Sequence, residues 1–126
     1  MSKILLVEDD GLMSRMYSRI FTHEGYEVET AADGEAGFVK AKEFQPDLVL
    51  LDVMMPRMNG LELIKKLKGD ERTRDIMLVL LTNLGIQEKL DEAMQLGATG
   101  CIIKSNHSPE EIIKIVEEFI NKKSSG

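Results

Sequence analysis

The stretch DLVLLDVMMPRMNG, residues 47–60, decides the fold. Residues 48–51 form an uninterrupted run of large apolar side chains, and a carboxylate, Asp52, follows directly. Such a run is typical of a central strand in a parallel sheet that is covered on both faces, whereas a half-exposed strand would alternate apolar and polar residues. We therefore predict a buried strand that ends in Asp52, which is either an ordinary surface acid or a nucleophile.

Short apolar runs and helical stripes alternate from one end of the chain to the other. We predict strands at 4–7, 26–32, 48–51, 76–81 and 101–103, and helices with apolar stripes over 13–21, 38–44, 61–67, 86–94 and 112–120. Local signals mark the ends of several helices, namely Gly25, Asp33, Pro46, and the capping box of Ser108 and Glu111 around Pro109. Five βα units with right-handed crossovers predict a doubly wound α/β fold with helices on both faces of a parallel sheet.

Length and composition indicate one globular domain. The chain has 126 residues, of which 43% are hydrophobic and 30% charged, and this balance is unlike that of a disordered segment. We place the domain at residues 1–121 and assign 122–126 to a polar tail or the start of a linker. A net charge of −6 argues against direct binding to nucleic acid. The single cysteine, Cys101, and the lack of a signal peptide or membrane span in the sequence favour a cytoplasmic location.

Polar side chains follow four of the five predicted strands, at the points where the strands end. They are Glu8, Asp9 and Asp10 after the first strand, Asp52 after the third, Thr82 and Asn83 at the fourth, and Lys104 after the fifth. The carboxyl ends of parallel strands meet at one edge of the sheet, where ligands bind in open α/β folds. Each residue alone could be an ordinary surface group, but their convergence predicts a site.

The chemistry of this set favours Mg²⁺ and phosphoryl transfer. Several carboxylates at close range need a positive charge among them, and an all-oxygen ligand set suits Mg²⁺ better than zinc. Asp52 then has the role of nucleophile, Lys104 neutralises charge, and Thr82 bonds a phosphoryl oxygen. The two histidines, His23 and His107, are expected at the surface.

These residues resemble the receiver domain of two-component response regulators, and the resemblance runs from Lys3 to about Ile120. The motif KILLVEDD holds the acidic pair, LVLLDVMMPRMNGLE holds the phosphoacceptor and the turn after it, LLT holds the switch hydroxyl, and IIK holds the phosphate-binding lysine. The resemblance implies a flavodoxin-like fold with strand order 2-1-3-4-5. It also implies that Mg²⁺, or Mn²⁺ in its place, is held by Glu8, Asp9, Asp52 and the main-chain carbonyl of Met54.

By this resemblance, Asp52 accepts a phosphoryl group from a histidine kinase or a histidine phosphotransfer protein. The phosphoryl group draws in Thr82 and changes the surface of the fourth helix, fifth strand and fifth helix, which contacts a downstream protein or output domain. The chain is then a switch that phosphorylates and dephosphorylates itself and is not a turnover enzyme. We expect a monomer or a weak, phosphorylation-dependent dimer without membrane insertion.

Three positions depart from the family pattern. Asn83 follows the switch threonine where a small residue is common, Cys101 stands where an aromatic residue usually precedes the lysine, and Ser105 follows Lys104 where proline is frequent. We expect the Lys104–Ser105 peptide to be trans, because a cis bond before a non-proline residue costs about 3 kcal/mol. The alternative function is a degenerate receiver that binds a partner without being phosphorylated.

Overall fold

The computed structural model describes residues 2–52, 60–82 and 87–125. Strands and helices alternate along these residues: β1 Lys3–Val7, α1 Gly11–His23, β2 Glu27–Ala31, α2 Gly34–Phe44, β3 Leu48–Leu51, α3 Gly60–Gly69, β4 Met77–Thr82, α4 Gln87–Leu96, β5 Gly100–Ile103 and α5 Pro109–Ser125. A short 3₁₀ helix, Lys104–Asn106, connects β5 to α5. The predicted strands and helices are therefore all confirmed, with ends that differ by a few residues.

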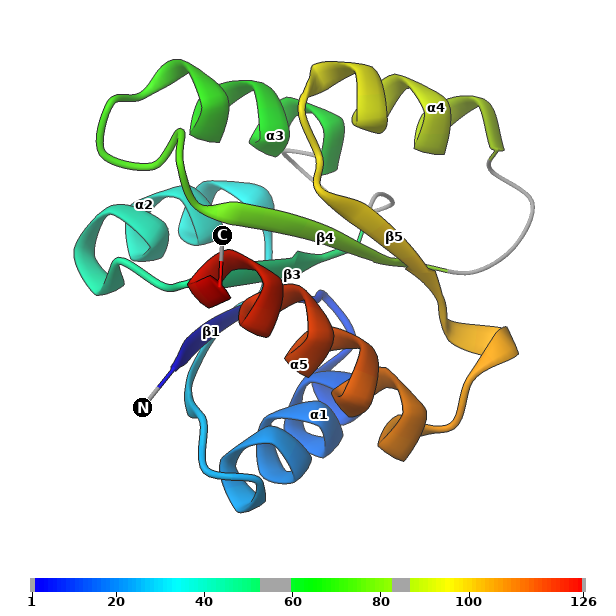
Figure 1. The fold of residues 1–126 in the computed structure, drawn as a ribbon. Helices are drawn as coiled ribbons and strands as arrows, with labels where there is room; N and C mark the ends of the chain where they lie inside the picture. Colours follow the sequence, from blue (N-terminus) through cyan, green and yellow to red (C-terminus); the bar gives the residue numbers. More distant parts are fainter. Residues whose placement is uncertain (1, 53–59, 83–86, 126) are drawn as a thin grey trace.

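The five strands form one parallel sheet in the order β2-β1-β3-β4-β5 (Figure 1). This is the predicted flavodoxin-like, doubly wound topology. The register pairs Val7 of β1 with Leu51 of β3, and Leu51 with Leu80 of β4. Because these three strands run in parallel and in register, the residues that follow them emerge at the same edge of the sheet.

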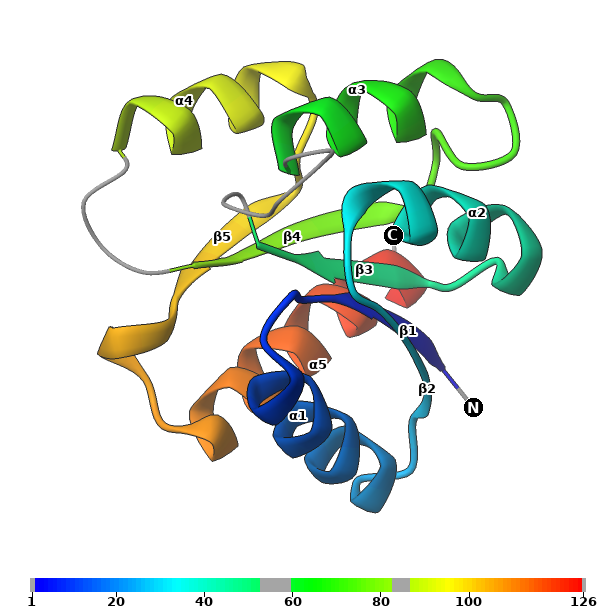
Figure 2. The same ribbon diagram turned by 180° about the vertical axis from the view of Figure 1, so that it is seen from behind.

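Helices cover both faces of the sheet and bury the central strands. Figures 1 and 2 show α1 and α5 on one face and α2, α3 and α4 on the other. Every residue of β3 and of β4 is buried. Two apolar clusters result, one on each face: Leu5, Val49 and Leu78 point into the first, and Ile4, Leu50 and Val79 into the second. The uninterrupted apolar run at 48–51 is thus explained by burial on both sides.

Side-chain hydrogen bonds cap the N-termini of α2 and α5, as predicted. The Asp33 carboxylate accepts from the backbone N–H of Ala36 at 2.9 Å and caps α2. At the start of α5, Glu111 accepts from the N–H of Ser108 at 2.9 Å, and the Ser108 hydroxyl accepts from the N–H of Glu111 at 3.2 Å. This reciprocal pair is the predicted capping box. Gly25 follows α1 with a φ of +98°, a conformation that only glycine adopts without strain.

Two details differ from the sequence-based expectations. Met94 was predicted on the inner face of α4 but is 45% exposed, because the buried stripe of this helix is narrower and passes through Leu90 and Ala93. The helix α5 continues to Ser125, beyond residue 121 where we placed the end of the domain, and the domain boundary stays a prediction. The remaining predicted stripe residue of α4, Ile86, lies outside the described residues.

None of the described helices is long and apolar enough to span a membrane.

Gly100, the first residue of β5, packs directly against an aromatic ring of α5. A Cβ atom at Gly100 would overlap the Cζ atom of Phe119 and would lie 2.9 Å from its Cε1 atom. The ring is half-buried and packs against the apolar cluster on the α1 and α5 face. The absence of a side chain at residue 100 therefore lets α5 approach the sheet closely.

We predict that Gly100→Ala lowers the free energy of unfolding by about 1 to 3 kcal/mol, because the added methyl group overfills this contact. Urea denaturation measures the change. Gly11→Ala is the matched control: Gly11 has open space around it and begins α1, so this variant should be neutral or slightly more stable. In a Phe119→Leu background the cost of Gly100→Ala should shrink, and an equal cost in both backgrounds would contradict the proposed overlap.

Candidate functional site

Backbone hydrogen bonds fix the two acidic positions at the ends of the central strands. The N–H of Asp52 donates to the carbonyl of Val7 at 3.2 Å, which continues the pairing of β1 and β3 by one residue. The N–H of Glu8 donates in the same way to Ala31, at 3.0 Å. Both carboxylates are therefore held by the sheet, although they lie just beyond the residues assigned to strands.

Four of the predicted site residues come together at this edge. The Nζ atom of Lys104 lies 2.6 Å from Oε1 of Glu8 and 3.7 Å from Oδ2 of Asp52. The hydroxyl of Thr82 lies 3.5 Å from Oδ1 of Asp52, which is long for a hydrogen bond between oxygen atoms. Lys104 and Thr82 thus approach different oxygen atoms of the same carboxylate. The Glu8 side chain is 4% exposed, that of Lys104 11% and that of Asp52 15%.

An acidic cluster at the same place has the geometry of a cation site. One carboxylate oxygen from each of Glu8, Asp9 and Asp52 lies within 4.8 Å of the others. Glu8 is buried, Asp52 is half-buried and Asp9 is exposed, so the cluster opens to solvent on one side. The predicted fourth ligand, the main-chain carbonyl of Met54, lies outside the described residues.

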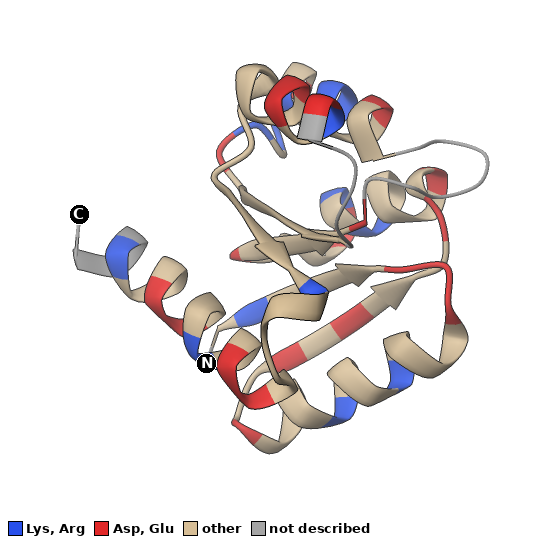
Figure 3. Cartoon of the chain, turned by 90° about the vertical axis from the view of Figure 1, so that its right-hand side faces the viewer, with Lys and Arg blue, Asp and Glu red and all other residues tan. Residues whose placement is uncertain are grey.

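A cavity of about 520 Å³ surrounds this cluster. Its lining consists of Glu8, Asp9, Asp10, Met13, Asp52, Lys104 and Ser105. Figure 3 looks toward the edge where the strands end and shows acidic segments gathered there. The cavity gives a small ligand access to the Asp52 carboxylate, the lysine and the acidic cluster at once.

Asp10 has a structural role in addition to its place beside the cavity. Its Oδ1 atom accepts hydrogen bonds from the N–H groups of Leu12 and Met13, at 2.9 and 3.3 Å, and caps α1. The sequence grouped Asp10 with the other acids at the strand end, whereas the cluster of close carboxylates includes only its two predecessors and Asp52. The short spacing between β1 and α1 thus combines a site and a helix cap in one acidic run.

Burial and charge oppose each other at the Glu8–Lys104 pair. Burial raises the pKa of Glu8, the nearby ammonium of Lys104 opposes this, and the negative charge of Asp52 adds to it. Burial would lower the pKa of Lys104, but its hydrogen bond and charge interaction with Glu8 outweigh that effect, and the pKa is raised. Lys104 is therefore held in its charged form. Its ammonium does not fully offset the effects of burial and of the Asp52 charge on the pKa of Glu8.

Sequence analysis missed the proximity of Tyr17 to this pair. The apolar stripe expected over residues 13–21 includes Tyr17, which is indeed buried. Burial raises the pKa of its hydroxyl, and the charges of Lys104 and Glu8 act on it in opposite directions. The sequence does contain a signal for this proximity, because the tyrosine hydroxyl lies on the apolar stripe of the helix that begins next to the acidic residues.

The structure describes two of the three positions that depart from the family pattern. The Lys104–Ser105 peptide is trans, as predicted, because the described residues contain no cis peptide. Cys101 is half-buried and packs against the cluster on the α2, α3 and α4 face, and burial raises the pKa of its thiol. Asn83 lies outside the described residues.

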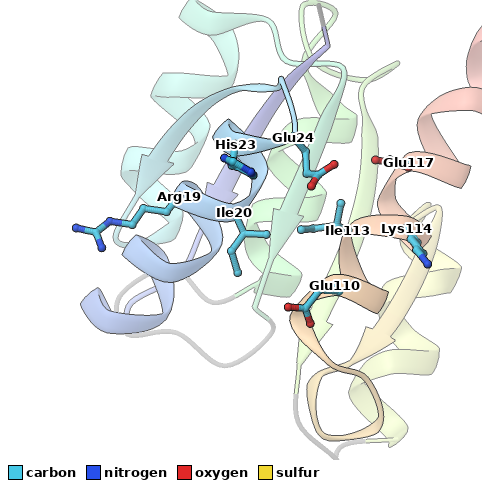
Figure 4. Close-up of a pocket in the computed structure, with 8 residues that line it drawn as sticks. All are labelled: Arg19, Ile20, His23, Glu24, Glu110, Ile113, Lys114 and Glu117. Carbon is cyan, nitrogen blue, oxygen red and sulfur yellow. The ribbon is translucent and has the colours of Figure 1, made fainter.

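A groove larger than this cavity lies elsewhere, between α1 and α5. It has a volume of about 730 Å³, and Figure 4 shows Ile20 and Ile113 between charged side chains of both signs. Its acids, Glu24, Glu110 and Glu117, do not belong to the cluster of converging carboxylates. Size alone therefore does not identify the site, and the convergence of carboxylates, lysine and hydroxyl at the strand ends does.

Comparison with known proteins places this geometry in a family. The family model described as the response regulator receiver domain matches residues 4–117. The chemotaxis protein CheY of Treponema pallidum is 37% identical over 81% of this chain and 72% of its own length. The transcriptional regulator RpaA of Synechocystis is 36% identical over 91% of this chain and 48% of its own length. The chain spans about half or less of the length of several curated relatives that it matches.

Solved structures agree with the sequence relatives. Chemotaxis protein CheY4 of Vibrio cholerae superposes with a TM-score of 0.86 at 35% identity, covering 94% of this chain and 98% of its own. A CheY-like receiver domain protein of Methanospirillum hungatei gives a TM-score of 0.90 at 27% identity and covers 100% and 99%. Receiver domains are phosphoacceptor signalling domains that bind Mg²⁺ at an acidic pocket and interact with histidine kinases and output domains. The fold, the acidic site and these relatives show that the chain belongs to the receiver domain family of response regulators.

Proposed function

We propose that this chain is a phosphorylation-activated switch that accepts a phosphoryl group on Asp52 in a Mg²⁺-dependent reaction. The donor is a phosphohistidine of a histidine kinase or of a histidine phosphotransfer protein. The observation that carries the proposal is the placement of Lys104 and Thr82 at 3.7 and 3.5 Å from the two oxygen atoms of the Asp52 carboxylate. The Asp52 carboxylate is 15% exposed and borders an open cavity, which gives a phosphoryl group a route to it.

The proposed reaction needs a nucleophile and a way to neutralise charge. A carboxylate oxygen of Asp52 forms a bond to phosphorus while the bond from phosphorus to the donor nitrogen breaks, and the electron pair stays with the imidazole. The product is an acyl phosphate. Lys104 is placed to neutralise the negative charge that gathers on the phosphoryl oxygens, and the Thr82 hydroxyl is placed to donate a hydrogen bond to one of them.

The acidic cluster fits Mg²⁺, with Mn²⁺ as an acceptable substitute. Glu8, Asp9 and Asp52 offer only oxygen atoms, which both ions prefer, and among the described residues the ammonium of Lys104 lies close to Glu8 and Asp52. We propose these three residues and the Met54 carbonyl as ligands. The ion would supply charge neutralisation next to Asp52. The Nζ atom of Lys104 lies 2.6 Å from Glu8 and 3.7 Å from Asp52.

The proposed switch links the site to the surface of α4, β5 and α5. Thr82 is buried and ends β4, and Lys104 directly follows β5, so both groups that face the phosphoryl position sit on strands next to that surface. We propose that this surface contacts a downstream protein or output domain. We further propose a domain of residues 1–121, a cytoplasmic location, no direct contact with nucleic acid, and self-phosphorylation and dephosphorylation without turnover of other substrates.

We predict that incubation with acetyl phosphate and Mg²⁺ adds one phosphoryl group to the protein, measured by intact mass. The addition should be lost in Asp52→Asn and after chelation of the metal. Asp33→Asn is the matched control, because asparagine caps a helix about as well as aspartate and Asp33, the cap of α2, is not part of the cluster. If no phosphoryl group is gained from acetyl phosphate, phosphoramidate or a histidine kinase, the chain is a degenerate receiver that binds partners without phosphorylation.

Mg²⁺ should stabilise the folded protein, because the cluster exists only when β1 and β3 are paired. At a concentration ten times its dissociation constant the ion should raise the free energy of unfolding by about 1.4 kcal/mol. Asp9→Asn should abolish most of this gain, whereas Asp10→Asn, which keeps the cap of α1, should retain it. Thermal unfolding with and without Mg²⁺ measures the gain, and an equal gain in Asp9→Asn would place the ion elsewhere.

The raised pKa of Glu8 predicts a pH dependence of stability in the absence of metal. Between the ordinary value of 4.5 and the raised value, folded protein holds a proton at Glu8 that unfolded protein has released. The contribution of Glu8 to the free energy of unfolding therefore grows as pH falls through the raised pKa, and is complete below 4.5. Wild type should thus gain stability relative to Glu8→Gln over this range in urea titrations, and parallel pH curves would contradict the shift.

A further inference from the structure

A second pocket lies at the opposite edge of the sheet, where β4 and β5 begin. It has a volume of about 590 Å³ and is formed by the end of α3, the connection from α3 to β4, the start of both strands and the end of α5. Figure 1 shows the end of α5 beside the start of β4, far from the edge that carries Asp52. Nothing in the proposed phosphoryl transfer uses this pocket.

The rim of the pocket is positively charged in a chain of net charge −6. Lys68, Arg74 and Lys122 contribute three cations, from three separate segments, against the single carboxylate of Asp75. The Nζ atom of Lys68 donates to the carbonyl of Arg74 at 3.0 Å, so this ammonium is already positioned at the rim. Among the described residues the guanidinium of Arg74 makes no hydrogen bond or ion pair. The pocket thus combines a fixed cation with an available one.

The floor of the pocket is apolar and preformed. Phe119 and Met77 line it, and the Phe119 ring is held against the backbone of Gly100, where any side chain would overlap it. Thr99 lies beside them, and its Oγ1 accepts from the N–H of Leu78 at 3.2 Å, which fixes the side chain and leaves its O–H free to donate. An aromatic wall, a hydroxyl donor and three cations therefore surround one space.

From these features we propose that the pocket binds a nucleotide. The phosphate would interact with Arg74 and the two lysines, the base would cover the apolar floor beside Phe119, and the ribose hydroxyls would donate to Asp75. A volume of about 590 Å³ falls within the usual range for small-ligand pockets. Inorganic phosphate or an acidic peptide would satisfy the cations alone and would leave the apolar floor in water.

The binding is tested by titrating the ¹⁵N-labelled protein with AMP in the absence of Mg²⁺, so that no metal links the phosphate to the acidic site. Amide shifts should concentrate on Asp75, Thr99 and Lys122. Adenosine, inorganic phosphate and an oligoglutamate peptide are titrated in parallel. AMP should bind at least about fivefold more tightly than any of them, because only AMP has both the ring and the phosphate.

Substitutions at the rim separate this site from other anion binding. Arg74→Gln and Lys122→Gln should each weaken AMP binding by about fivefold, which is typical of losing one partly exposed cation. The matched controls are Lys65→Gln on α3 and Lys114→Gln on α5, which remove cations from the same helices outside the pocket and should leave binding unchanged. The Asp52→Asn protein should bind AMP as wild type does, so this result is independent of phosphorylation.

Three results would overturn the proposal. Equal affinity for AMP and inorganic phosphate would show that the cations bind anions without using the apolar floor. Equal or tighter binding of oligoglutamate would identify the pocket as a contact for an acidic peptide segment. Unchanged AMP affinity in both Arg74→Gln and Lys122→Gln would place the nucleotide outside this pocket.

Discussion

The rest of the structure depends on the burial of β3 and β4 on both faces of the sheet. Their side chains have no solvent-facing side, so helices must lie above and below, and the backbone must satisfy its hydrogen bonds within a parallel sheet. Parallel strands bring all their carboxyl ends to one edge. The position of the functional site follows from this single constraint, because Asp52 stands one residue beyond a strand that cannot shift without exposing its apolar side chains.

At that edge, the balance of charges distinguishes the site from an ordinary polar surface. Three carboxylates share the neighbourhood of one ammonium, and the shortest contact of that ammonium is with Glu8 and not with Asp52. Among the described residues, one ammonium therefore faces three carboxylates. Lys104 directly follows β5 and lies 2.6 Å from Glu8 and 3.7 Å from Asp52, so a change of charge at Asp52 would act directly on a residue at the end of this strand.

The sequence predicted the parts of this structure that depend on local patterns. The run at 48–51, the cap at Asp33 and the Ser108–Glu111 capping box each need only a few neighbouring residues, and all were confirmed. The convergence of Glu8, Asp52, Thr82 and Lys104 was predictable because the ends of parallel strands share an edge. The roles of these residues in phosphoryl transfer stay predictions.

Other features depend on distances that no local pattern contains. The exposure of Met94 and the preference of Lys104 for Glu8 both depend on how side chains pack in three dimensions. The influence of Lys104 on Tyr17 likewise joins residues that are far apart in the sequence. The close packing of Phe119 on Gly100 depends on how α5 is positioned over β5, which the sequence does not specify. Tertiary packing, and not secondary structure, limited the prediction in each case.

The contact between Glu8 and Lys104 joins residues that are 96 positions apart in the chain. During synthesis on the ribosome, the first strands and their acids leave the exit tunnel long before β5 is available to pair with β4. A nascent chain therefore carries the acidic residues without the lysine that partly neutralises them. The acidic residues and their lysine therefore come together only when nearly the whole domain has emerged.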